Sequence, residues 1–243
     1  METRRQTKSR RQNGGAGRLK SSTCARRDNC RLCGSTNLTS LISLAPTPPA
    51  NAFVCCDQVG LPQACFPLDV YMCESCKHVQ LLDVVNPSIL FTNYIYVSGT
   101  SPVFVKHFEN YATSVIREFV PNHSDQLVID IGSNDGTLLS QFKRKGMRVL
   151  GIDPAKEIAR NASKAGIETW PEFFTPALAE KIVAHYGHAQ IVAANNVFAH
   201  ADDLTGIASG IRTLLAPDGV FVFEVSYLAD VYEKILFDTI YHE

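Results

Sequence analysis

The sequence predicts an α/β protein in which a parallel sheet covered by helices follows a small cysteine-rich module. Apolar strand-like runs alternate with helical patterns from residue 127 onward, a glycine-containing turn follows the first run, and two Cys-x-x-Cys pairs precede it. The chain has 243 residues, of which 45% are hydrophobic, so it can bury a sizeable core. No window reaches the roughly 18 uninterrupted apolar residues of a membrane span, so we expect no membrane partner.

A basic arm opens the chain, and we predict that residues 1–28 are disordered. Residues 1–31 hold ten Lys or Arg against two acids, although the net charge of the whole chain is −1. This composition is typical of a nucleic-acid tail, an organelle transit peptide or a solvated extension without function. Because no aromatic residues are interleaved with the charges, we do not expect a nucleic-acid partner. The arm lacks the apolar core of a secretory signal, so we expect a cytoplasmic protein, with organelle import left open.

Four of the eight cysteines form two Cys-x-x-Cys pairs, which are Cys30 with Cys33 and Cys73 with Cys76. Each pair can offer two thiolates to one tetrahedral ion, so we predict a structural zinc site within a domain spanning residues 29–100. The 39 residues between the pairs exceed the roughly 15–20 of a zinc ribbon, so a sizeable segment must loop out. The alternative is four unligated cysteines in a reduced protein. The other four are expected to be buried or surface thiols: Cys24, Cys55, Cys56 and Cys65.

A connector rich in hydroxyl groups, residues 91–101, follows the cysteine module and includes Tyr94 and Tyr96. It either packs one domain on the other or forms a lid that carries tyrosine hydroxyls to a substrate, and both interpretations stay open. A helical pattern then runs from about Pro102 to Phe119, within a second domain predicted over residues 101–243.

The first strand of that domain ends in a tight turn that opens a helix near Thr137. A strand, a glycine turn and a helix in this order are typical of a cofactor site, because the helix start directs free N–H groups towards a ligand. The turn lacks the spacing Gly-x-Gly-x-x-Gly, and an acid within it would repel a diphosphate but suits a cation such as S-adenosylmethionine. The candidate cofactor contacts are Asp130, Gly132, Asn134, Asp135 and Gly136.

A second apolar strand, residues 148–152, ends at Asp153 and Pro154. Asp153 lies close to the offset of about 20 residues at which a carboxylate binds ribose hydroxyls. It can also cap the helix that begins near Pro154, and both roles are compatible.

Further strands and helices alternate to the end of the chain. We predict helices over 155–165, 176–186 and 207–215, and strands over 168–170, 190–194 and 220–225. The carboxyl ends of parallel strands meet at one edge of a sheet, where ligands bind. Substrate and cofactor are therefore expected to meet near Asn195, Asn196, His200 and Glu224.

These motifs, in this order, resemble the S-adenosylmethionine-dependent C-methyltransferases of nucleotide-linked deoxysugars. The resemblance covers nearly everything from Cys30 to Glu243 and rests on the cysteine pairs and on the segments 94–99, 130–136, 151–154, 195–200 and 241–243. It implies a Rossmann-like methyltransferase sheet, a zinc-binding amino-terminal domain, and methylation at C-3 of a nucleotide-linked 4-keto-6-deoxysugar.

The implied reaction needs a base, an enolate-stabilising group and an aligned methyl donor. Imidazole suits proton removal near neutral pH, which makes His200 and His242 candidate bases, and tyrosine hydroxyls can donate to an enolate oxygen. The candidate catalytic residues are His200, Tyr94, Tyr96, Tyr241, His242 and Glu243.

The sequence departs from the family pattern at its end. Family members continue with a histidine, the favoured base, and a third domain, whereas here a helix-like run over 232–240 leads to Glu243. We therefore expect the chain to be a fragment that binds S-adenosylmethionine without turnover. Alternatives are a methyltransferase of another metabolite, a zinc-bearing binding module, and a nicotinamide oxidoreductase, which the glycine spacing disfavours.

Overall fold

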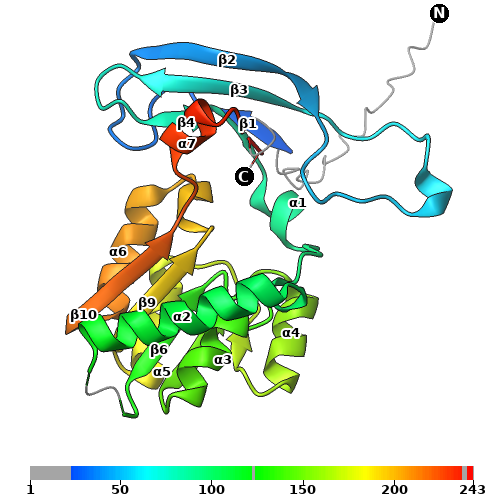
Figure 1. Cartoon of the computed structure of the whole chain (residues 1–243). Helices are drawn as coiled ribbons and strands as arrows, with labels where there is room; N and C mark the ends of the chain where they lie inside the picture. Colours follow the sequence, from blue (N-terminus) through cyan, green and yellow to red (C-terminus); the bar gives the residue numbers. More distant parts are fainter. Residues whose placement is uncertain (1–22, 122–123, 237–239, 243) are drawn as a thin grey trace, which may run out of the picture.

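The computed structural model describes residues 23–121, 124–236 and 240–242. A small antiparallel domain lies above a larger domain with a parallel sheet (Figure 1). The helix α1 (Pro87–Phe91) and the connector, residues 91–101, join the two domains. Among the described residues, no helix is long and apolar enough to cross a membrane.

The small domain contains two antiparallel sheets. Strands β2 (Leu38–Thr47), β3 (Phe66–Cys73) and β4 (Val79–Leu81) form one, and β1 (Cys24–Arg26) pairs with β5 (Asp83–Val85) in the other. Alternate residues of β3 are buried, which is the pattern of a strand with one face on a core. The segment between the cysteine pairs is thus mainly the β2–β3 hairpin.

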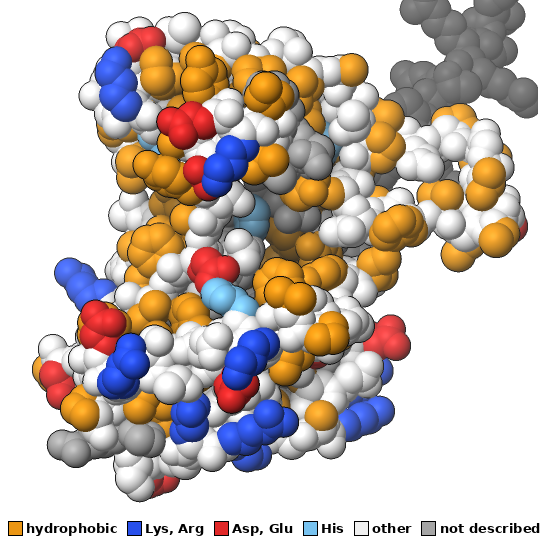
Figure 2. Space-filling view, viewed as in Figure 1, with side chains coloured by type: hydrophobic (Ala, Val, Ile, Leu, Met, Phe, Trp, Pro, Cys, Tyr) orange, Lys and Arg blue, Asp and Glu red, His pale blue; other side chains and the backbone are white. Residues whose placement is uncertain are grey.

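A long loop joins β2 to β3 and contains the 3-10 helix η1 (Cys56–Gln58). It extends to one side of the small domain and exposes several hydrophobic side chains (Figures 1 and 2). Those that are more than half exposed are Phe53, Val59 and Leu61.

Strand β1 corrects the predicted extent of the basic arm. Cys24 lies opposite Val85 in the β1–β5 ladder, so the chain has entered the fold before residue 28. The backbone N–H of Arg27 donates to Leu82, which extends this attachment by one residue. Composition suggested a solvated arm because charge dominates it, but backbone pairing does not depend on side-chain polarity. Residues 1–22, the rest of the predicted arm, lie outside the described residues.

The large domain has a five-stranded parallel sheet in the order β10-β9-β6-β7-β8. The strands are β6 (Leu127–Ile131), β7 (Arg148–Ile152), β8 (Thr169–Trp170), β9 (Ala189–Asn195) and β10 (Leu215–Glu224). The helices are α2 (Pro102–Phe119), α3 (Thr137–Arg144), α4 (Lys156–Lys164), α5 (Pro176–Tyr186) and α6 (Leu204–Leu214). The predicted alternation of strands and helices is confirmed, and α2 and α5 have the expected limits.

The core consists of two hydrophobic clusters, one on each face of this sheet. On one face Val128 packs with residues of α2 and α3, and on the other Ile129 packs with residues of α5 and α6. Successive residues of a strand point to opposite faces, so β6 contributes to both clusters. This arrangement leaves the carboxyl edge of the sheet facing the connector and the small domain (Figure 1).

The predicted helix over 232–240 is wrong in its limits. The structure has α7 (Leu228–Glu233) instead, and Ile235 follows with a positive φ of 55°. Such a φ ends a helix. The apolar run continues past this point, but residues 237–239 lie outside the described residues.

Candidate functional site

The four cysteines of the two pairs converge at one point of the small domain. Their sulfur atoms all lie within 4.8 Å of one another, with Sγ–Sγ distances of 3.7 Å for Cys30 and Cys76 and 3.5 Å for Cys33 and Cys73. Four thiolates about 2.3 Å from a zinc ion lie roughly 3.8 Å apart in a tetrahedron. The residues therefore fit a structural zinc ion, and four protein ligands leave no open position for water.

The backbone around each knuckle favours thiolates. Burial opposes ionisation of Cys30, but N–H groups of Cys33 and Leu32 lower its pKa to about 6. N–H groups of Cys76 and Ser75 likewise lower the pKa of Cys73. The N–H of His78 acts in the same direction on Cys76, but burial and the neighbouring thiols outweigh it and raise the pKa of Cys76 to about 12. Metal ligation requires the deprotonated form, so ionisation of all four thiols requires a bound cation.

A cavity of about 590 Å³ lies at the carboxyl edge of the parallel sheet. One side is formed by strand ends and the glycine turn, and the opposite side by the connector that carries Tyr94 and Tyr96. A third side is the segment 195–207, which includes the 3-10 helix η3 (Phe198–His200). Most sequence-predicted site residues line it: Asp130, Gly132, Asn134, Asp153, Pro154, Asn195, Asn196, His200, Tyr94 and Tyr96.

Gly132 and Ser133 of the glycine turn line this cavity. Gly132 has a φ of +73°, and a Cβ atom there would overlap the side chain of Val197, so the position requires glycine for packing as well as for backbone conformation. Ser133 is 4% exposed, and its hydroxyl has no hydrogen-bond partner within the described part of the chain. This hydroxyl lies against the backbone of Gly151, where a Cβ atom would overlap it, so Gly151 is needed for close packing of β7 on the turn.

Two buried carboxyl groups lie at the ends of adjacent strands. Burial, and secondarily the charge of Asp153, raises the pKa of Asp130 well above its ordinary value. Burial also raises the pKa of Asp153, although N–H groups of Ala155 and Asn134 partly oppose this effect. Both N–H groups donate to the Asp153 carboxylate at 2.8 Å. Asp153 therefore fixes the glycine turn and the start of α4, and it also lines the cavity.

Asp135 and Gly136 do not line this cavity. They border a shallow depression on another side of the turn, and Asp135 accepts hydrogen bonds from the N–H groups of Gly99 at 2.9 Å and Thr137 at 3.1 Å. The neighbouring Asn134 accepts from the N–H of Ser98 and donates to the carbonyl of Tyr96. The acid expected beside a cationic ligand thus holds the connector against the turn.

Asn195 and Asn196 follow β9 at the cavity wall. The Asn195 amide oxygen accepts from the Tyr111 hydroxyl at 3.3 Å, while its buried Nδ2 has no partner among the described residues. Asn196 has a φ of 54°, and its N–H donates to the carbonyl of Glu224. This left-handed conformation turns the chain into the segment that carries His200.

Two of the carboxyl-terminal candidates, Tyr241 and His242, do not line the cavity. His242 is buried, and its Nε2 lies 3.1 Å from the carbonyl oxygen of Phe66 in the small domain. Tyr241 is about half exposed and does not line the cavity. Glu243 lies outside the described residues. Glu224, at the end of β10, pairs at 2.8 Å with His107, which the sequence interpretation did not select.

Sequence reasoning missed two groups of cavity residues. The first is aromatic and comprises Phe104 and Phe108 of α2 with Phe173 and Phe174 before α5. The second is acidic and comprises Glu172, Asp202 and Asp203. Helical periodicity places Phe108 in the core, but it does not show that the apolar face of α2 also borders a cavity. The Asp203 side chain accepts from the N–H of Gly206, so it could have been recognised as the cap of α6.

Comparison with known proteins agrees with both parts of this structure. A zinc-binding domain family matches residues 30–91, and a methyltransferase domain family matches residues 104–243, more than half of the chain. The C-methyltransferase NovU of Streptomyces niveus is 35% identical over 216 residues, which are 89% of this chain and 51% of NovU. The chain thus spans about half the length of this relative. A ubiquinone biosynthesis O-methyltransferase of Methylobacterium sp. (strain 4-46) is 35% identical over 101 residues, covering 39% of this chain and 38% of that protein.

Solved structures show weaker similarity. The PH0226 protein of Pyrococcus horikoshii OT3 is 16% identical with a TM-score of 0.46, over 58% of this chain and 62% of that one. The assignment therefore rests on the sequence matches and on the sheet, turn and cysteine cluster described above. The chain belongs to the methyltransferase family that carries an amino-terminal zinc-binding domain.

Proposed function

We propose that the cavity binds S-adenosylmethionine and that the methyl group is transferred to a carbon atom, C-3, of a nucleotide-linked 4-keto-6-deoxysugar. The observation that carries the proposal is the pair of buried carboxyl groups, Asp130 and Asp153, at the cavity. S-adenosylmethionine carries a sulfonium and an ammonium group, so it compensates negative charge that is costly to bury alone. The similarity to NovU supports the choice of carbon as the acceptor.

The two sides of the cavity suit two ligands. The strand ends and the glycine turn would bind the methyl donor, with Asp153 accepting hydrogen bonds from ribose hydroxyls. The connector and the segment 195–207 would bind the sugar. Bound S-adenosylmethionine supplies an electrophilic methyl group, and the chain has to hold the acceptor carbon in line with it.

Residues of the chain would perform the proton chemistry. His200 lines the cavity and is the candidate base for the proton next to the ketone, whereas His242 packs on Phe66. Tyr94 and Tyr96 line the connector side, and their hydroxyls are candidates to donate to the developing enolate oxygen. The Tyr94 hydroxyl accepts from the side chain of Asn51 at 3.4 Å, a contact that does not use the hydroxyl's own proton. Aromatic side chains around them keep water from the reacting carbon.

A ketone-dependence assay tests this function. The chain spans about half the length of NovU, so the assay uses a protein that carries this chain at the full length of that relative. With labelled S-adenosylmethionine, we expect label to enter a thymidine-diphosphate 4-keto-6-deoxysugar but not the corresponding 4-hydroxy sugar, because only the ketone acidifies the neighbouring carbon. Prior exchange of that proton with deuterated water should require the protein and should be lost in His200→Ala. Equal labelling of both sugars would show oxygen as the acceptor and would contradict the proposal.

A further inference from the structure

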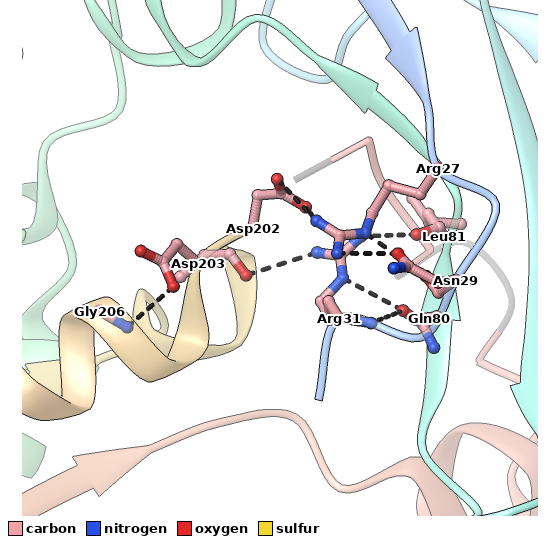
Figure 3. Close-up of polar contacts among 9 residues, drawn as sticks. Arg27, Asn29, Arg31, Gln80, Leu81, Asp202, Asp203 and Gly206 are labelled. Atoms are coloured by element: carbon pink, nitrogen blue, oxygen red, sulfur yellow. Dashed lines mark hydrogen bonds and ion pairs between the residues drawn. The ribbon is translucent and has the colours of Figure 1, made fainter. Parts of the chain in front are cut away.

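Two arginines on either side of Cys30 connect the zinc site to the cavity wall (Figure 3). The guanidinium of Arg27 donates to both carboxylate oxygens of Asp202, at 2.9 and 3.1 Å. That of Arg31 donates to the carbonyl oxygen of Ala201 at 3.4 Å. Neither arginine lines the cavity, but both acceptors do.

Each arginine is also held on the small-domain side. The Arg27 side chain donates to the backbone carbonyl and the side-chain oxygen of Asn29, the residue before Cys30. The Arg31 side chain donates to the carbonyl of Leu81, and its backbone N–H donates to Gln80. Because these contacts restrict both guanidinium groups, the direction in which they point depends on the backbone of the first cysteine knuckle.

The segment that receives them, residues 200–203, joins η3 to α6. Asp203 caps α6 by accepting from the N–H of Gly206 at 2.8 Å, and His200 precedes the two contacted residues. The backbone N–H of His200 donates to the carbonyl of Val197, and that of Ala201 donates to the carbonyl of Phe198. The guanidinium groups of Arg27 and Arg31 thus join the two residues that follow His200 to the small domain (Figure 3).

We propose that Arg27 and Arg31 are positioning residues that couple the metal knuckle to this segment, so that metal binding sets the geometry of the cavity wall. The proposal rests on the proposed function insofar as this wall borders the site of methyl transfer. The Arg27 and Asp202 side chains are 27% and 40% exposed, and such ion pairs contribute at most about 1 kcal/mol to stability. The expected consequence is therefore local geometry rather than global stability.

Hydrogen exchange of the zinc-loaded chain tests the coupling without any assay of activity. In the double variant Arg27→Ala/Arg31→Ala, we expect amides of residues 198–207 to exchange at least about threefold faster, while amides of α3 are unchanged. Arg26→Ala is the matched control, because Arg26 directly precedes Arg27 and pairs with Asp83 inside the small domain. Zinc content should stay at one equivalent in all variants.

Two further variants keep the test decisive if the double variant folds poorly. Asp202→Asn leaves the small domain intact and should accelerate exchange of the same segment. The charge exchange Arg27→Asp/Asp202→Arg should restore slow exchange relative to Arg27→Asp alone. Removing zinc with a chelator should accelerate amide exchange of residues 198–207 in the wild type. The same treatment should increase the exchange rate of these amides less in the double variant.

Exchange of 198–207 that is as slow in the double variant and Asp202→Asn as in Arg26→Ala would overturn the proposal. In an active protein, Arg27→Ala should raise KM for the sugar about three- to tenfold and leave KM for the methyl donor unchanged. If the protein that carries this chain at the full length of NovU methylates no ketosugar, the proposed function fails, whereas the exchange result still decides whether the arginines couple the two domains.

Discussion

Two buried carboxyl groups dominate the electrostatics of the cavity at the scale of single residues. Asp130 and Asp153 lie on adjacent strands, and β6–β7 pairing brings them to the same edge of the sheet. Burial raises the pKa of both. A bound anion would add to the negative charge of these carboxyl groups when they are ionised, whereas a bound cation would offset it. This difference favours a sulfonium donor over a dinucleotide.

The stability of the ligand-free protein should depend on the ionisation of Asp130. Its folded-state pKa lies above the unfolded value of about 3.9, so its contribution is present below that value and is lost as pH rises through the folded-state pKa. Asp153 acts in the same direction. We predict that Asp130→Asn lessens the fall in unfolding free energy with rising pH, as measured by urea denaturation from pH 5 to 8. The control is Asp57→Asn, at an exposed site. If the unfolding free energy depends on pH in the same way in this control and in Asp130→Asn, the prediction is contradicted.

Asp153→Ala should weaken binding of S-adenosylhomocysteine by about 1.5–3 kcal/mol, because charge-assisted hydrogen bonds to the ribose are lost. The carboxylate also holds the N–H groups of Asn134 and Ala155, so some global stability should be lost as well. Calorimetric titration and thermal denaturation separate the two effects. Lower stability with unchanged affinity would limit Asp153 to its capping role.

At the scale of elements, the connector and the glycine turn form one unit. Side chains of Asn134 and Asp135 hold the backbone from Tyr96 to Gly99, so the tyrosine side of the cavity is attached to its cofactor side. The sequence indicated a polar turn with an acid in it but could not show that the acid faces the connector. That direction depends on a contact between residues 36 positions apart.

The strands and helices of the large domain were predictable because their apolar periodicity is strong and their caps are local. Ser101 and Thr175 cap α2 and α5 through bonds to residues three positions on, so both helices begin where the sequence suggests. Strand β1 was not predictable, because its partner β5 is about 60 residues away and it has only three residues. Likewise, the packing of His242 on Phe66 joins distant segments that have no common motif.

The attachment of β1 gives a truncation prediction at the same scale. Deleting residues 1–22 should leave the melting temperature nearly unchanged. Deleting residues 1–28 removes β1 and the Arg27–Asp202 pair, so it should lower the melting temperature by several degrees, given that about 1 kcal/mol corresponds to 2–4 °C at this chain length. Differential scanning calorimetry of the two truncations makes the comparison, and equal melting temperatures would mean that β1 contributes nothing to stability.

At the scale of the whole molecule, the small domain depends on its metal site. Its two sheets have only two and three strands, and the knuckles bring together segments about 40 residues apart. We predict one zinc per chain, bound by Cys30, Cys33, Cys73 and Cys76, and a clear loss of stability on chelation. Elemental analysis and thermal denaturation measure both. Less than about half an equivalent, with stability unaffected by chelator, would rule out a structural zinc site.

The central claim is that the cavity between the sheet, the connector and segment 195–207 binds a methyl donor, and calorimetric titration of the zinc-loaded chain tests it most directly. We predict that S-adenosylmethionine and S-adenosylhomocysteine each bind with a stoichiometry of one, and that NAD and a DNA duplex give no heat of binding. A saturable titration with NAD, or none with either adenosyl compound, would contradict the account.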